Sequence, residues 1–135
     1  MASKKVLFTI TKKYCAKYSI NDAYAGKEIA IYNYSYKHIA KHKDEFYSED
    51  SYNFAVNEIA NIVSNPDFIT INSGNSSMNL IKKITEDNVL VALTINYDED
   101  DLVVKTMYPI RDFKYRVLKE KSLWSMNIQK LIQNN

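Results

Sequence analysis

The stretch YNFAVNEIANIVSNPDFITIN, residues 52–72, decides the fold class because its hydrophobic period changes within it. The first half has the i, i+3, i+4, i+7 spacing of a helix that packs on a core, and Asn65 followed by Pro66 predicts the end of that helix. From Phe68 the apolar residues alternate, which is typical of a strand over residues 68–72. The helical stripe consists of Tyr52, Ala55, Val56, Ile59, Ile62 and Val63.

Three more β-prone segments follow at short intervals. Residues 78–84, 89–97 and 102–108 have strand character, SGNSS (73–77) is expected to be a loop, and the acidic run 98–101 is expected to be a turn. Consecutive strands with short connections predict an antiparallel meander. Helices followed by a run of strands predict the α+β class, with helices packed on one antiparallel β-sheet.

The flanking segments add elements at both ends of the chain. Residues 6–11 and 28–32 are β-prone, whereas residues 12–25 are ambiguous. Ser35 can cap a helix over about residues 36–46, because its hydroxyl can accept from a first-turn amide. Residues 112–121 are expected to be helical. A further helical segment that folds back onto the body is indicated by Leu123, Trp124, Ile128, Leu131 and Ile132.

Length and composition indicate one folded domain. The chain has 135 residues, 46% hydrophobic and 25% charged, which is too short for two ordinary domains. It lacks an apolar run of the roughly 18 residues that span a bilayer and also lacks signal-peptide features, so a cytoplasmic protein without a membrane partner is expected. Cys15, the single cysteine, excludes an intramolecular disulfide, and a buried or incidental thiol is favoured over a nucleophile.

Both histidines lie in YKHIAKHK, residues 36–43. Imidazole is the side chain best suited to proton transfer near neutral pH, and the surrounding lysines, Lys41 among them, would attract a phosphate. On a regular helix His38 and His42 share one face, with about 6 Å between their Cβ atoms. The stretch therefore indicates phosphodiester chemistry.

Two other interpretations of the histidine pair stay open. One is a metal site, but HIAKH lacks the glutamate of HExxH, the lysines would repel a cation, and Asp44 or Glu45 would supply only a third ligand. The other is a pair of solvent-exposed histidines without a role. Neither a metal nor another cofactor is expected.

Lys82 is a third candidate for RNA cleavage. Cleaving RNA without a metal requires a base, an acid and a cation or donor for the charge that develops on phosphorus. Alternation puts Lys82 on the same strand face as Met78, Leu80 and Ile84. This face is largely apolar, so the presence of a lysine on it requires an explanation. A catalytic role and an ammonium that snorkels to water from the sheet edge are both open.

Thr106 and Tyr108 lie on one face of the last predicted strand, and Arg111 follows directly. Their hydroxyl groups and the guanidinium can hold a phosphate. Threonine and tyrosine are also ordinary strand residues, so a structural role is the alternative.

The order of these motifs resembles a known family. EIAIYNYS (28–35) precedes a helix with HIAKH (38–42), an amphipathic helix closes with SNPDFI (64–69), and the last strand is LVVKTMYPI (102–110). This arrangement is similar to the phage Barnase-EndoU-Colicin-RelE-like (PBECR) nuclease domains of phage polyvalent proteins, mobile elements and bacterial toxins. The resemblance covers about residues 27–120, leaving an N-terminal extension of residues 1–26 and a C-terminal helical tail of residues 121–135.

The resemblance implies an antiparallel sheet with helices packed to one side and metal-independent RNA cleavage by transesterification to a 2′,3′-cyclic phosphate. It implies that His38 and His42 exchange protons with the substrate and that Thr106 and Lys82 contact the scissile phosphate. A role for Tyr108 and Arg111 in the same site is implied more weakly. Expected partners are RNA, with tRNA as one candidate, and an immunity protein or antitoxin. The cytoplasm where it acts would be that of the producing cell or of a target cell. The rival hypothesis is a non-catalytic module on the same fold that binds RNA or a host protein.

Overall fold

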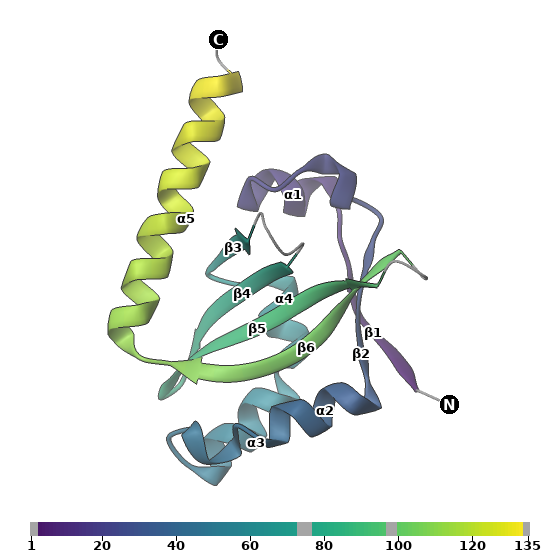
Figure 1. Ribbon diagram of the computed structural model, residues 1–135, viewed down its shortest axis with the longest axis vertical. Coiled ribbons are helices and arrows are strands. Elements are labelled where there is room, and N and C mark those ends of the chain that lie inside the picture. Colours follow the sequence, from purple (N-terminus) through teal and green to yellow (C-terminus); the bar gives the residue numbers. More distant parts are fainter. Residues whose placement is uncertain (1–2, 73–76, 97–99, 134–135) are drawn as a thin grey trace.

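The computed structural model describes residues 3–72, 77–96 and 100–133, with side chains as far as residue 127. Five helices pack on a six-stranded sheet (Figure 1). The strands are β1 (Lys4–Thr9), β2 (Glu28–Tyr32), β3 (Phe68–Asn72), β4 (Ser77–Ile84), β5 (Asp87–Asn96) and β6 (Asp101–Ile110). The helices are α1 (Lys12–Tyr18), α2 (Asn33–Ala40), α3 (Glu49–Asn57), α4 (Ile59–Ser64) and α5 (Asp112–Gln133), with short 3-10 helices η1 (Asp22–Tyr24) and η2 (Lys43–Glu45).

The sheet has the order β1-β2-β6-β5-β4-β3. Strands β3 to β6 form the predicted antiparallel meander, and the α+β class is confirmed. Strands β1 and β2 form an antiparallel pair, which joins β6 through parallel pairing of Ile29 with Leu102 and of Ala30 with Val103. The sheet is therefore mostly antiparallel, with one parallel seam.

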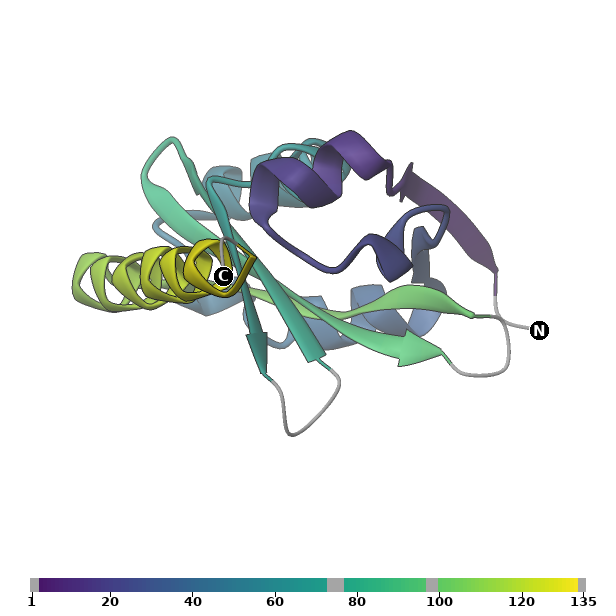
Figure 2. The same ribbon diagram turned by 90° about the horizontal axis from the view of Figure 1, so that it is seen from above.

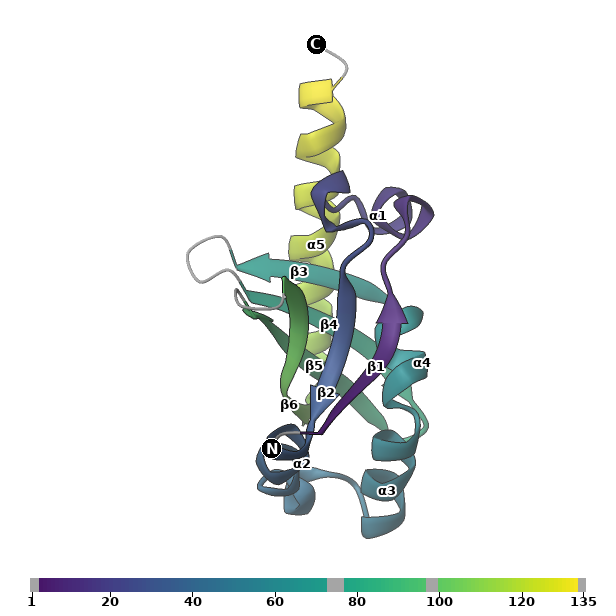
Figure 3. The same cartoon turned by 90° about the vertical axis from the view of Figure 1, so that its right-hand side faces the viewer.

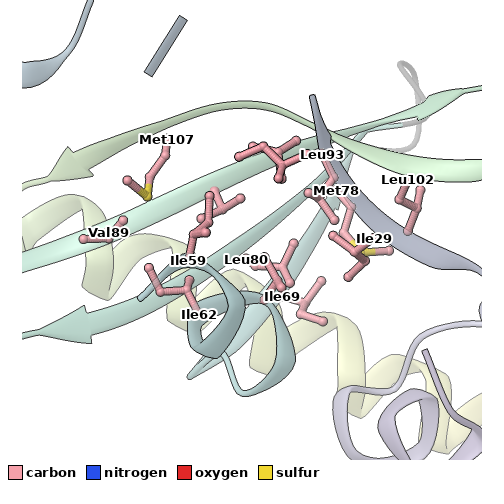
Figure 4. Close-up of a cluster of buried hydrophobic side chains, with 14 of the residues drawn as sticks. Ile29, Ile59, Ile62, Ile69, Met78, Leu80, Val89, Leu93, Leu102 and Met107 are labelled. Carbon is pink, nitrogen blue, oxygen red and sulfur yellow. The ribbon is translucent and has the colours of Figure 1, made fainter. Parts of the chain in front are cut away.

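The main core lies between one face of the sheet and helices α1 and α4. Figure 4 shows Ile59 and Ile62 of α4 facing strand residues that include Leu80 and Val89. The hydroxyl groups of Tyr14 and Tyr18 anchor α1 by donating to backbone oxygens at the end of α4 and just beyond it, each at 2.7 Å. Residues before Lys27 thus belong to the same sheet and core. Cys15 is fully buried there, as the favoured interpretation of a structural thiol predicts.

Helix α5 covers part of the opposite face. Tyr115 packs with Phe68, Ile81 and Leu90 in a second apolar cluster. The Ser122 hydroxyl donates to the Ile69 carbonyl at 2.9 Å, which ties α5 to β3. Figure 3, in which α5 stands behind the sheet, shows that helices lie on both sides rather than on one.

Helix α2 protects the free edge of β6. Pairing of β6 with β2 ends at Val103, so the backbone of β6 beyond this point needs other partners. Ser35, fully buried, donates to the Val104 carbonyl at 2.6 Å and accepts from the Tyr32 amide at 3.2 Å. These bonds hold α2 alongside β6.

The prediction of a helix over residues 36–46 is wrong at both ends. Helix α2 begins at Asn33, because Ser35 bonds back to Tyr32 from inside the first turn. It ends at Ala40, where the Lys41 and His42 amides bond to carbonyls three residues back. The 3-10 helix η2 then changes the chain direction.

The amphipathic helix of residues 52–63 is two helices, α3 and α4. Glu58 separates them with φ −95° and ψ 8°, outside helical values. The break turns α4 so that Ile59, Ile62 and Val63 are all buried. The sequence has no glycine or proline at this point, so only packing explains the bend.

The C-terminal segment does not fold back. Helix α5 is continuous from residue 112 to residue 133, since neither glycine nor proline interrupts it. Leu123 and Trp124 are 51% and 66% exposed, and Figure 1 shows the end of α5 extending beyond the sheet. Outside the described residues lie the loop at 73–76, residues 98 and 99 of the predicted turn, and the side chains of Ile128, Leu131 and Ile132. No helix in the described part of the chain combines the length and apolar character that crossing a membrane requires.

Candidate active site at the free edge of β6

His42 lies just after α2, at the start of η2. Its φ of −100° and ψ of 5° place it in the turn that ends α2. Its side chain is 32% exposed, so the ring is partly sheltered and still accessible. Its Nδ1 is hydrogen-bonded to the Glu45 carboxylate, three residues further along.

The Glu45 carboxylate fixes the tautomer of His42. A carboxylate accepts hydrogen bonds, so Nδ1 of the ring carries the proton and donates it. In the neutral ring Nε2 then has the free lone pair and can accept a proton from another molecule. A carboxylate that orients an imidazole in this way is the arrangement used for general base catalysis.

The Tyr108 ring of β6 packs against the His42 ring. Its centroid is 5.2 Å from that of His42, with an angle of 39° between the rings. Burial and, to a smaller extent, the charge of Glu45 raise the pKa of Tyr108 above its ordinary value. Its hydroxyl group therefore stays protonated and can donate a hydrogen bond.

Thr106 lies two residues before Tyr108 on the same face of the sheet. The pairing of Thr106 with Ala92 and of Tyr108 with Leu90 sets this arrangement. The Thr106 hydroxyl is buried and has no hydrogen-bond partner among the described residues. A buried hydroxyl without a partner costs free energy, which calls for an explanation beyond packing.

The structure brings these side chains together from segments far apart in the sequence. We call His42, Glu45, Thr106 and Tyr108 the β6-edge site. Figure 1 shows the reason for the proximity, because α2 runs below β6 and delivers η2 to its free edge.

His38 and Lys41 lie beside this site on α2 and at its end. Both side chains are exposed, and neither has a polar partner in the described part of the protein. Because α2 ends between His38 and His42, the regular i, i+4 geometry expected for the pair does not apply. The solvent-exposed interpretation describes His38 better than His42.

Lys82 lies on the other face of the sheet. It pairs with Val89, which belongs to the main core, whereas Tyr108 belongs to the second cluster. Its ammonium group donates to the Asn65 carbonyl at 2.8 Å and lies 3.8 Å from the Asp67 carboxylate. Lys82 thus satisfies a carbonyl at the C-terminus of α4, where a cation is favourable.

Arg111 connects β6 with α5. Its carbonyl accepts from the Tyr115 amide at 2.9 Å, which starts α5, and its side chain is exposed. It lies directly after the end of β6, the strand that carries Thr106 and Tyr108. The residue is available to a ligand but is not bound into the β6-edge site.

A family model described as phage-Barnase-EndoU-ColicinE5/D-RelE like nuclease3 (PBECR3) matches residues 9–116. The chain belongs to the PBECR3 family. The resemblance inferred from the sequence motifs is confirmed, and the family name is that of a phage-type nuclease of the Barnase-EndoU-Colicin-RelE kind. No curated protein and no solved structure matches the chain.

The PBECR3 match includes the whole β6-edge site. It begins at the end of β1 and stops at Arg116 in the second turn of α5. The rest of α5, from Val117, lies outside the match.

From the sequence, Glu45 was considered only as a third ligand of a metal site. Its spacing of three residues from His42 was the available signal for a hydrogen-bonded pair. No three His, Cys, Asp or Glu side chains of the described residues are grouped so that they could hold a metal ion. Glu45 joins the predicted site residues as the side chain that orients the His42 ring.

Proposed function

We propose that this PBECR3 chain is an endoribonuclease that cleaves RNA by transesterification without a metal ion. The observation that carries the proposal is the His42 ring, bonded through Nδ1 to Glu45 and packed against Tyr108, on the strand that also carries the unpartnered hydroxyl of Thr106. The group combines a proton acceptor with donors in one partly exposed place.

In this reaction the 2′-oxygen of a nucleotide attacks the adjacent phosphorus. His42 Nε2 takes the proton of the 2′-hydroxyl, a P–O bond forms to the 2′-oxygen, and the bond to the 5′-oxygen of the next nucleotide breaks. The leaving oxygen needs a proton, which His38 is proposed to donate. The products are a 2′,3′-cyclic phosphate and a free 5′-hydroxyl.

The phosphate needs donors for the charge that develops on its oxygens. The hydroxyl groups of Thr106 and Tyr108 are proposed to supply them, with Lys41 and Arg111 attracting the RNA backbone from their exposed positions. The Thr106 hydroxyl has no partner among the described residues, which supports this role, but the oxygen is buried, so the side chain must turn outward before a bound phosphate oxygen can satisfy it. Lys82 is not part of the proposed group, since its ammonium already binds the end of α4.

A nuclease that acts on cellular RNA endangers the cell that makes it. The proposal therefore includes a toxin role and an inhibitor, either an immunity protein or an antitoxin. Expression of the wild type should restrict growth, and the His42→Ala variant should relieve the restriction if RNA cleavage is the cause.

The decisive experiment compares the purified wild type with His42→Ala on total RNA in the presence of EDTA. Fragments ending in 2′,3′-cyclic phosphate from the wild type alone are expected. Because the His42 ring is partly exposed, thermal unfolding should show that both proteins are folded. Intact RNA with the folded wild type would contradict the proposal and favour the non-catalytic binding module.

A further inference from the structure

A row of small and polar side chains crosses the sheet from Thr106 to the opposite edge. The strand register pairs Thr106 with Ala92, Ala92 with Asn79, and Asn79 with Thr70. Paired residues in antiparallel strands project from the same face, so all four lie on the face that carries Tyr108. Neighbouring strands are about 4.8 Å apart, so Asn79 lies on the order of 10 Å from Thr106.

This row is less deeply buried than the adjacent row. Phe68, Ile81, Leu90 and Tyr108 form the neighbouring row, which packs against α5. The side chains of the polar row are half-buried. Neither Thr70 nor Asn79 uses its side chain in a hydrogen bond within the described ranges, so their polar groups are available to a ligand.

The row ends at a cavity of about 520 Å³ at the free edge of β3. The cavity lies between β3, α5 and the segment that follows α1, and Figure 2 shows α5 and α1 on either side of this edge. A volume in this range suits one small ligand. The lining residues that matter here are Thr70, Ile71, Asn79, Leu118, Lys121 and Met126.

The walls of the cavity are held in place by specific bonds. Ser122 binds the Ile69 carbonyl at 2.9 Å, and the Tyr115 hydroxyl donates to Asp67 at 3.0 Å. These two bonds, about two helical turns apart on α5, fix the helix over β3 and the residue before it. The cavity is thus formed before any ligand arrives.

The chemistry of the lining matches a nucleotide. Leu118, Ile71 and Met126 offer apolar surface to the flat face of a base, and the Asn79 amide offers both a donor and an acceptor to its edge. The Lys121 ammonium group is suited to a phosphate. A small apolar ligand would leave the amide and the ammonium unused.

We propose that this cavity binds one nucleotide of a single-stranded RNA whose backbone crosses the sheet along the polar row from Thr106. The inference rests on the proposed function, because it extends the same substrate from the β6-edge site. The cavity residues from Leu118 onward lie outside the PBECR3 match, so this subsite would give the chain a base preference of its own.

Binding is measured in the full-length His42→Ala background, so that the RNA stays intact. The probes are fluorescein-labelled single-stranded RNA hexamers of uridine, cytidine or adenosine, followed by fluorescence anisotropy. Asn79→Ala is compared with Asn57→Ala, an exposed asparagine on α3, and Lys121→Ala is compared with Lys5→Ala on β1. Thermal unfolding of each variant checks that it is folded.

Asn79→Ala is expected to raise Kd by about 3- to 10-fold for the preferred hexamer and less for the others, as the loss of one hydrogen bond predicts. Lys121→Ala is expected to weaken binding of all hexamers, with an effect that shrinks as salt rises. Both controls should bind like the parent. Equal Kd values for Asn79→Ala, Lys121→Ala and their controls would overturn the subsite.

The cleavage rate of the corresponding variants with His42 intact separates the two proposals. Cleavage that persists unchanged in Asn79→Ala and Lys121→Ala, together with unchanged Kd values, overturns the subsite and leaves the nuclease standing. A folded wild type that neither binds nor cleaves RNA overturns both.

Discussion

The rings of His42 and Tyr108 lie with their centroids 5.2 Å apart, although one belongs to the turn after α2 and the other to the last strand of the sheet. The contact forms because β2 leaves the edge of β6 free beyond Val103 and α2 occupies the space. A proton acceptor is thus delivered to a strand that carries two hydroxyl groups.

Glu45→Gln should reduce RNA cleavage at least about tenfold while leaving thermal stability nearly unchanged, because the side chain is exposed and its main partner is the His42 ring. An amide does not hold the ring in one tautomer, since it can donate as well as accept. Initial cleavage rates give the answer. The matched control is Glu49→Gln, an exposed glutamate that pairs with Lys43. Equal rates for both variants would rule out an orienting role for Glu45.

Thr106→Val should leave the free energy of unfolding unchanged or raise it by about 1 kcal/mol, because it replaces a buried hydroxyl without a partner by a methyl group of similar size. Cleavage should fall if the hydroxyl binds the phosphate. Urea unfolding and cleavage rates are measured together, with Thr106→Ser as the variant that keeps a hydroxyl. A marked loss of stability in Thr106→Val would mean that the hydroxyl has a structural partner.

Lys82→Met should lower the free energy of unfolding by about 1–3 kcal/mol, because it removes the charged donor to the Asn65 carbonyl. Its cleavage rate, measured where the variant is fully folded, should stay close to that of the wild type. Lys5→Met, at an exposed position on β1, controls for loss of charge. Unchanged stability with lost cleavage would instead restore Lys82 to the catalytic group that the family resemblance implies.

Tyr115 links stability to alkaline pH. Burial, followed by the hydrogen bond to Asp67 and the charge of Asp67, raises the pKa of Tyr115 to about 12. A group whose pKa is higher in the folded state stabilises fully below its unfolded pKa of about 10, and this stabilisation is lost as pH rises from about 10 to 12. Wild type should therefore exceed Tyr115→Phe in stability near neutral pH, and the difference should shrink across that range.

Denaturant unfolding at pH 8, 10 and 11 measures the Tyr115 effect. Tyr47→Phe is a suitable control, because Tyr47 is 73% exposed. Ionisation of the other buried tyrosines lowers the free energy of unfolding of both proteins over the same pH range. Only the difference between wild type and Tyr115→Phe therefore reports on Tyr115. A difference that stays constant with pH would show that Tyr115 ionises in the folded protein as it does in the unfolded chain.

Several parts of the fold could be predicted because they depend on neighbours in the sequence. The strands β2 and β3 were predicted with their observed bounds, and the meander followed from alternation and short connections. The end of α4 followed from Asn65 and Pro66. In contrast, the end of α2 and the break at Glu58 carry no local signal, because both depend on what the helix packs against.

The site divides in the same way. His42, Thr106 and Tyr108 were chosen from the chemistry of their side chains, and their proximity was not derivable, because the free edge of β6 depends on where β2 stops pairing. Lys82 is a further example. Its place on an apolar strand face was predicted correctly, but its partner could not be, because the carbonyl that it binds comes from the end of α4.

The sequence by itself determined the fold class, the order of the strands in the meander and the family, because these follow from local periodicity and short motifs. Only the tertiary structure decided which polar groups meet, which helix lies on which face, and that α5 and β3 enclose a cavity. The physical reason is that hydrogen bonds such as Ser35 to Val104 and Ser122 to Ile69 join residues far apart in the chain, and local sequence does not specify such pairs.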